Sequence, residues 1–362
     1  MGTVSLSPNG LDQYRLTARP DALLVGTMAG VVDLRKGAGT WTVAERTLEG
    51  IHVSSLLCDH ARDAVYAGSH GDGIFRRTAG GAWAERSHGL TVRNVFSLAR
   101  SDEGPRSVLY AGTEPAHLFR SRDGAETWDE LPALRSIPGR EGWNFPAPPH
   151  IAHTKHVDVD PRDAATLYVS IEQGALLKST DGGATFRELH FQDPTYVLNK
   201  DTHRIVFNPR DPDELYLPGG DGIARSRDGG ATWERFATPA MRVGYPDATF
   251  CSPDGDGALY VTGGGTSPDK WRATGNAHAA VVRSRDGGRT WDVLGLPDLR
   301  GNIEAATLVS WPGGFGFFAG TTDGEVYASV DKGETWTQIA AGLPPVSKSI
   351  HHRNIQMGRG AA

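Results

Sequence analysis

The chain has 362 residues, a formal net charge of −6, and 46 Gly and 22 Pro. Phosphate binding needs a concentrated basic face, so this charge balance disfavours nucleic acids and anionic membranes as partners. No segment is long and apolar enough to span a membrane, and the first residues do not read as a signal peptide. We therefore expect a cytoplasmic protein in which Cys58 and Cys251 are not bonded to each other.

One short motif recurs along the chain, and each copy ends in an aromatic residue. Two weak copies end at Trp41 and Trp83, and five strong copies follow: Ser121–Trp128, Ser179–Phe186, Ser226–Trp233, Ser284–Trp291 and Ser329–Trp336. The closing aromatics lie 42 to 58 residues apart, and the segments between them alternate apolar and polar residues in short strand-like runs with no expected helix. This period predicts an all-β, seven-bladed β-propeller with four-stranded antiparallel blades, forming one domain over residues 1–362.

The motif, which we call the box, has a structural explanation. Its Asp can accept hydrogen bonds from backbone N–H groups of a turn, its glycines can adopt positive φ, and its aromatic residue can pack between neighbouring blades. Lys36 and Thr78 occupy the Asp position in the two weak copies, so we expect those turns to be less well tied.

The boxes resemble those of the Asp-box, or BNR-repeat, propellers. This superfamily includes sialidases, sortilin-type ectodomains, photosystem assembly factors and bacterial proteins of the glycosyl hydrolase type, and the resemblance covers residues 13–340. It implies a propeller fold and leaves the activity open. The Arg-Ile-Pro that the sialidase pattern has near its start is absent, which disfavours true sialidase activity.

In a propeller, first strands begin and second strands end at the same rim of the channel, so polar residues at those places should converge. Neutral imidazole is a common ligand for divalent transition metals, and a mixed His and carboxylate set suits a catalytic metal site. The candidate metal ligands are His52, His70, His153, His156 and His203. Glu114 and Glu172 are candidates for ligation or for general acid and base catalysis.

A plainer interpretation of these residues is that they hydrogen-bond strand ends or trapped waters without any metal. Side chains alternate along a strand, so only one or two histidines of the run His150–His156 should point inward.

Three long connections should surround the same rim, over residues 131–152, 191–202 and 263–276. Trp143 and Trp271 lie in two of them and are candidates to stack on a sugar ring, or else to act as hydrophobic plugs that hold the loops. Arg204 and Arg353 are further candidates for binding substrate.

The sequence therefore predicts an enzyme, a hydrolase or lyase, that acts on a small polar or carbohydrate-like substrate with a divalent transition metal as candidate cofactor. The alternatives are a metal-free glycosidase of the sialidase-like type with paired carboxylates, and a non-catalytic scaffold or assembly factor that binds a protein partner. Residues 344–362 are expected to close the ring by adding a strand beside Thr3–Ser7, or to cap the channel.

Overall fold

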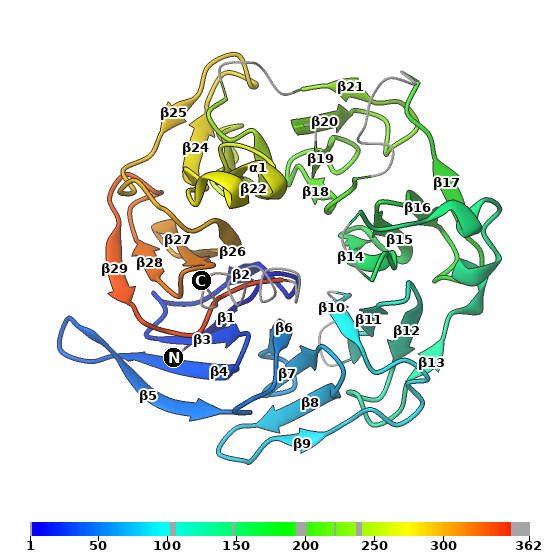
Figure 1. Ribbon diagram of the computed structural model, residues 1–362, viewed down its shortest axis with the longest axis horizontal. Helices are drawn as coiled ribbons and strands as arrows, with labels where there is room; N and C mark the ends of the chain where they lie inside the picture. Colours follow the sequence, from blue (N-terminus) through cyan, green and yellow to red (C-terminus); the bar gives the residue numbers. More distant parts are fainter. Residues whose placement is uncertain are drawn as a thin grey trace. The chain divides into compact units, whose positions relative to one another are not determined.

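The computed structural model describes residues 2–101, 106–146, 149–192, 201–220, 222–236 and 241–348. Within these residues the strands form seven separate sheets, six of four strands and one of five. Figure 1 labels the strands of each sheet. The predicted all-β, seven-bladed β-propeller with four-stranded antiparallel blades is confirmed.

The chain forms two compact units, and the first contains Met1–Leu56 and Pro239–Ala362. Its first sheet consists of β1 (Thr3–Leu6), β3 (Ala22–Thr27), β4 (Gly30–Lys36) and β5 (Trp41–Thr47). The second consists of β22 (Tyr245–Cys251), β23 (Leu259–Gly264), β24 (Ala280–Ser284) and β25 (Asp292–Val293). The third consists of β2 (Gln13–Arg15), β26 (Ile303–Trp311), β27 (Gly314–Thr321), β28 (Val326–Ser329) and β29 (Thr337–Ala340).

The second unit contains Leu57–Thr238. Its first sheet consists of β6 (Val53–Asp59), which begins in the first unit, β7 (Ala64–Ser69), β8 (Gly73–Thr78) and β9 (Ala84–Glu85). Its second sheet consists of β10 (Val95–Arg100), β11 (Leu109–Thr113), β12 (Leu118–Ser121) and β13 (Asp129–Glu130). The third sheet consists of β14 (His153–Asp160), β15 (Asp163–Glu172), β16 (Ala175–Ser179) and β17 (Arg187–Leu189). The fourth consists of β18 (Val206–Phe207), β19 (Leu215–Gly219), β20 (Gly222–Ser226) and β21 (Glu234–Arg235).

Two of the long connections contain short helices that the sequence did not lead us to expect. They are the 3-10 helices Pro132–Ser136 and Arg140–Gly142, and the α-helix α1 (Pro268–Thr274). The limits of α1 follow from its sequence, because Pro268 is tolerated in a first turn and Gly275, with φ 75°, ends the helix in the left-handed region. None of the helices in the described residues has the length and apolarity that crossing a membrane would require.

The N-terminal segment joins two sheets of the first unit. β1 pairs in parallel with β3, and β2 pairs in parallel with β26. The other side of β1 faces β26, because Thr307 Oγ1 donates to Ser5 O at 2.8 Å. The described part of the expected clasp, residues 344–348, forms no strand, and residues 349–362 lie outside the described residues, so the tail strand beside Thr3–Ser7 stays a prediction.

The five strong boxes fold alike, as the sequence predicted. In the box of Asp181, Oδ1 accepts the N–H of Thr185 at 2.9 Å, and Oδ2 accepts the hydroxyl of Thr185 at 2.6 Å. Ser179 adds two bonds, to Asp181 Oδ1 and from the N–H of Gly183. The same bonds recur around Asp123, Asp228, Asp286 and Asp331.

Each strong box in the second unit is also bonded to the preceding blade. The carbonyl of Gly229 accepts from Tyr168 Oη and Lys178 Nζ, at 2.8 and 2.9 Å. Arg76 and Arg120, from third strands, bond in the same way to the box glycines of the next blade. These bonds link neighbouring blades through the tyrosine of the second strand and the basic residue of the third.

The box aspartates predict how stability depends on acid. Hydrogen bonds from Thr185 lower the pKa of Asp181 from 3.8 to about 2, and those from Thr290 lower the pKa of Asp286 to about 2. A depressed pKa contributes stability that is fully present above the unfolded value and is lost as the pH falls through the folded value. We expect the unfolding temperature to fall between pH 4 and pH 2.

An Asp181→Asn, Asp286→Asn double variant should unfold at a lower temperature at neutral pH and should lose less than the wild type over that acid window. Circular dichroism melts at several pH values measure both effects. Asp129→Asn, at an exposed position of β13, is the control. If the unfolding temperature of the double variant falls between pH 4 and pH 2 as much as that of the wild type, the box aspartates do not cause the loss of stability in acid.

Candidate functional site

Polar side chains from the ends of neighbouring strands meet in the second unit. His153 begins β14 and lies opposite Glu172, the last residue of β15. Its Nε2 is 2.6 Å from Glu172 Oε2, and its Nδ1 is 3.3 Å from Oε2 of Glu114, which follows β11. The expected convergence of first-strand starts and second-strand ends is therefore observed in this unit.

The ring of His153 is fully buried and lies between two carboxylates. It stacks on Phe96 with ring centroids 3.7 Å apart. Burial lowers the pKa of His153, but the hydrogen bonds of Glu114 and Glu172 outweigh this effect, and the net pKa is raised. A raised pKa favours an imidazolium between the two glutamates.

Three more charged or polar groups surround Glu172. Lys155 Nζ is 2.6 Å from Glu172 Oε1. His203 Nε2 is 3.7 Å from the same oxygen and 3.5 Å from Asp201 Oδ1. Glu172 and Asp201 are also joined by an isolated backbone bridge, and the side chains of both are almost completely buried. We call Glu114, His153, Lys155, Glu172, Asp201 and His203 the glutamate–histidine cluster.

The cluster continues through an amide to another predicted histidine. Asn94, just before β10, donates from Nδ2 to Glu114 Oε1 at 3.2 Å. His70, just after β7, lies with Nδ1 2.8 Å from Asn94 Oδ1. His70 thus belongs to the same hydrogen-bond network, in which Asn94 and Glu114 stand between it and His153.

His156 and His150 lie outside the cluster. The pairing of β14 with β15 shifts register between Thr154 and His156, and His156 Nδ1 lies 3.0 Å from Asp158 Oδ1. His150 is exposed and its Nδ1 lies 3.0 Å from a backbone carbonyl. Of the run His150–His156, only His153 joins the cluster, within the expected number of one or two inward-pointing histidines.

His52 belongs to the first unit, where it meets the last described residues of the chain. Its Nε2 is 3.1 Å from Ser347 O. Ser347 Oγ donates to Glu304 Oε2 at 2.8 Å, and Lys348 Nζ bonds to Asp247. These contacts form a second polar group at the starts of β22 and β26.

The predicted substrate-binding residues are dispersed. Trp143 and Trp271 are partly buried, and each packs against an apolar core cluster of its own unit. This packing is what the hydrophobic-plug interpretation expects, while stacking on a sugar stays a prediction. Arg204 is 6% exposed beside His203, and Arg353 lies outside the described residues.

Sequence reasoning missed Lys155 and Asp201. Lys155 stands two residues from His153 on the same strand, so both side chains reach Glu172 on one face of the sheet. That spacing was a usable signal. Asp201 carries no comparable signal, because only the bridge between neighbouring blades places it beside Glu172.

The donor atoms of Glu172, Asp201 and His203 lie within 4.8 Å of one another and could ligate a cation. A tetrahedral ion with ligands at about 2.0–2.1 Å would separate them by about 3.3 Å, close to the observed 3.5 and 3.7 Å. The ammonium of Lys155, however, already contacts the Glu172 oxygen that would have to bind the ion. The residues fit an ion only if Lys155 moves away.

No protein-family model matches the chain. A xyloglucanase from a Paenibacillus species is 27% identical over 270 residues, which cover 66% of this chain and 25% of that protein. A xyloglucanase from Hypocrea jecorina is 26% identical over 280 residues, which cover 67% of this chain and 32% of that protein. The crystal structure of an ancestral GH74 enzyme matches with a TM-score of 0.60 and 18% identity, covering 87% of this chain and 39% of that one.

These comparisons agree with the propeller fold and show that parts of the chain are similar in sequence to curated xyloglucanases. The chain spans about a quarter to a third of the length of the curated relatives it matches. The glycosidase alternative that the sequence left open fits these relatives better than a metal-dependent hydrolase or lyase does.

Proposed function

We propose that this chain is a glycoside hydrolase that acts on a xyloglucan-like polysaccharide. The observation that carries the proposal is the sequence similarity to curated xyloglucanases over as much as two thirds of the chain. Glycoside hydrolysis typically needs two carboxyl groups, one to protonate the leaving oxygen and one to act as base or nucleophile. The glutamate–histidine cluster contains three carboxylates, of Glu114, Glu172 and Asp201.

The pair that suits this chemistry is Glu172 with Asp201. Their oxygens approach within 4.8 Å, near the separation of about 5–5.5 Å that retaining glycosidases use. His153 and Lys155 neutralise the charge of Glu172 and would hold it as the ionised partner, which leaves Asp201 as the proton donor. Both carboxylates are almost completely buried, so the surrounding side chains have to open to admit a sugar.

Glu114 and Glu172 do not suit the role of a catalytic pair together. The imidazole of His153 lies between them and contacts both, so it occupies the space that a glycosidic bond would need. In this proposal Glu114 positions His153, and through it Glu172.

The proposal is tested by incubating the purified chain with xyloglucan, unsubstituted β-glucan and a small sialoside, and analysing the products by mass spectrometry. We expect oligosaccharides from xyloglucan and none from the sialoside. Activity that persists after dialysis against a chelator would agree with the carboxylate pair. The absence of product from every glycan would contradict the proposal and would favour a scaffold.

A metal-dependent hydrolase or lyase is the second candidate, and the donor group of Glu172, Asp201 and His203 is the observation that favours it. The contact of Lys155 with Glu172 argues against it, so we assign no step to a metal. Activity that disappears with the chelator and returns with added divalent cation would select this candidate instead.

A further inference from the structure

A pocket of about 290 Å³ lies in the first unit, at the outer edge of the sheet that contains β24 and β25. The chain leaves the sheet after Leu294, whose N–H donates to Val281 O at 2.9 Å, and returns where Leu299 bridges to Ala279. The residues between them form one wall. The pocket is lined by Arg242, His278, Ala279, Ala280, Val293, Leu294, Leu296, Pro297 and Asp298.

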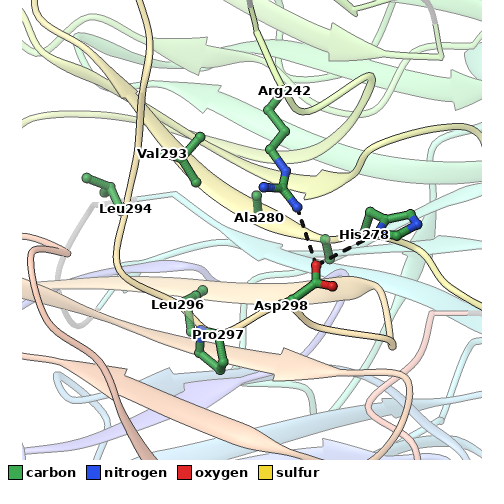
Figure 2. Close-up of a pocket in the computed structure, with 9 residues that line it drawn as sticks. Arg242, His278, Ala280, Val293, Leu294, Leu296, Pro297 and Asp298 are labelled. Carbon is green, nitrogen blue, oxygen red and sulfur yellow. Dashed lines mark hydrogen bonds and ion pairs between the residues drawn. The ribbon is translucent and has the colours of Figure 1, made fainter.

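The polar side of the pocket is built around one carboxylate. Figure 2 shows Arg242 and His278 turned toward Asp298. Arg242 Nη2 is 3.4 Å and His278 Nδ1 is 3.8 Å from Asp298 Oδ1, longer than the 2.7–2.9 Å typical of a charge-assisted hydrogen bond. Each group keeps hydrogen-bonding capacity beyond these contacts, because a guanidinium has five N–H donors and a carboxylate has about four acceptor positions.

The other side of the pocket is apolar. Val293, Leu296 and Pro297 form it, and Val293 is 52% exposed, one of few large apolar side chains left in solvent among the described residues. A ligand with a C–H face would cover Val293 and remove that apolar surface from water.

The charges of the pocket indicate a neutral ligand. The charges of the Arg242 guanidinium and the Asp298 carboxylate offset each other, so the pair offers little net attraction to either an anion or a cation. Adjacent hydroxyl groups on one ring can donate to Asp298 and accept from Arg242 and His278. A volume near 290 Å³ is at the small end for ligand sites and suits one sugar ring.

We propose that this pocket binds one neutral pyranose residue, with two adjacent hydroxyls bonded to Asp298 and Arg242 and a C–H face on Val293 and Leu296. This inference rests on the proposed function for its substrate class, since a xyloglucan-like polymer presents such residues. The pocket shares no residue with the glutamate–histidine cluster, so it would be an additional binding site.

The test is calorimetric titration of the full chain with xylose, glucose and glucuronate. Arg242→Ala and Asp298→Ala should each weaken binding of the neutral sugar by at least about tenfold, the effect of losing a hydrogen bond to a charged group. The matched controls are Arg285→Ala and Asp292→Ala, an exposed ion pair at 3.3 Å in the same sheet. The controls should change binding by less than about twofold.

Saturable binding of a neutral sugar that falls in the two pocket variants and not in the controls supports the inference. The absence of neutral-sugar binding, equal binding by all variants, or stronger binding of glucuronate would each overturn it. Hydrolysis of xyloglucan is assayed on the same variants. Hydrolysis without pocket binding would refute this inference alone, and pocket binding without hydrolysis would refute the proposed function alone.

Discussion

Replacing Glu172 with Ala is expected to lower the free energy of unfolding by about 3–5 kcal/mol. The carboxylate lies 2.6 Å from both Lys155 Nζ and His153 Nε2, and all three side chains are at least nine-tenths buried. Removing it leaves an ammonium and an imidazolium facing each other in a region that water scarcely reaches. Urea unfolding followed by fluorescence measures the change.

Two further variants make this prediction specific. Glu188→Ala, a partly exposed glutamate on β17 of the same sheet, should change stability by less than about 1 kcal/mol. A Glu172→Gln, Lys155→Met double variant should be less destabilised than the sum of its single variants, because removing both charges avoids an unpaired one. A loss in Glu172→Ala as small as that in Glu188→Ala would mean that the cluster does not stabilise the fold.

Replacing Asp201 with Asn is expected to reduce hydrolysis of xyloglucan by about 10²-fold to 10⁴-fold, the usual contribution of a positioned general acid or base. Asn keeps the size of the side chain but cannot supply the proton. Initial rates of reducing-end release measure the loss. Asp211→Asn, in the exposed turn between β18 and β19, is the control and should retain the wild-type rate.

If the Asp201→Asn protein hydrolyses xyloglucan as fast as the Asp211→Asn protein, Asp201 is not the proton donor. Thermal unfolding of both variants is recorded alongside, so that a fall in rate is not mistaken for a fall in folded protein.

The fold could be predicted because its signal is local and repeated. Each closing aromatic, from Trp41 to Trp336, begins a fourth strand or stands immediately before one. The box bonds join residues no more than four apart, as between Asp181 and Thr185, so the sequence alone shows their partners. Blade number and strand order follow from this repetition.

The candidate site could be predicted only in part. The rule for strand ends correctly brought His153, Glu172 and Glu114 together, because it depends on topology alone. It did not separate His156 from His153, since a local shift of register decides which face each side chain takes. It also missed Asp201, which reaches the cluster through a contact between neighbouring blades.

The closure of the N-terminal segment shows a second limit of sequence reasoning. Thr3–Leu6 has the apolar alternation of a strand, but the sequence does not say which strand will be its partner. The structure pairs it in parallel with β3, whereas the strands within the blades are otherwise antiparallel except where β2 joins β26. The pocket around Asp298 was missed for a similar reason, because its walls come from three separate segments.

Recognition of xyloglucan is the central claim, and binding to the inactive variant tests it most directly. Calorimetric titration of the Asp201→Asn protein with a purified xyloglucan oligosaccharide separates recognition from cleavage. We predict saturable binding that an unsubstituted cello-oligosaccharide of the same backbone length does not match. The absence of heat beyond dilution, with a correctly folded protein, would contradict the assignment of this propeller to carbohydrate.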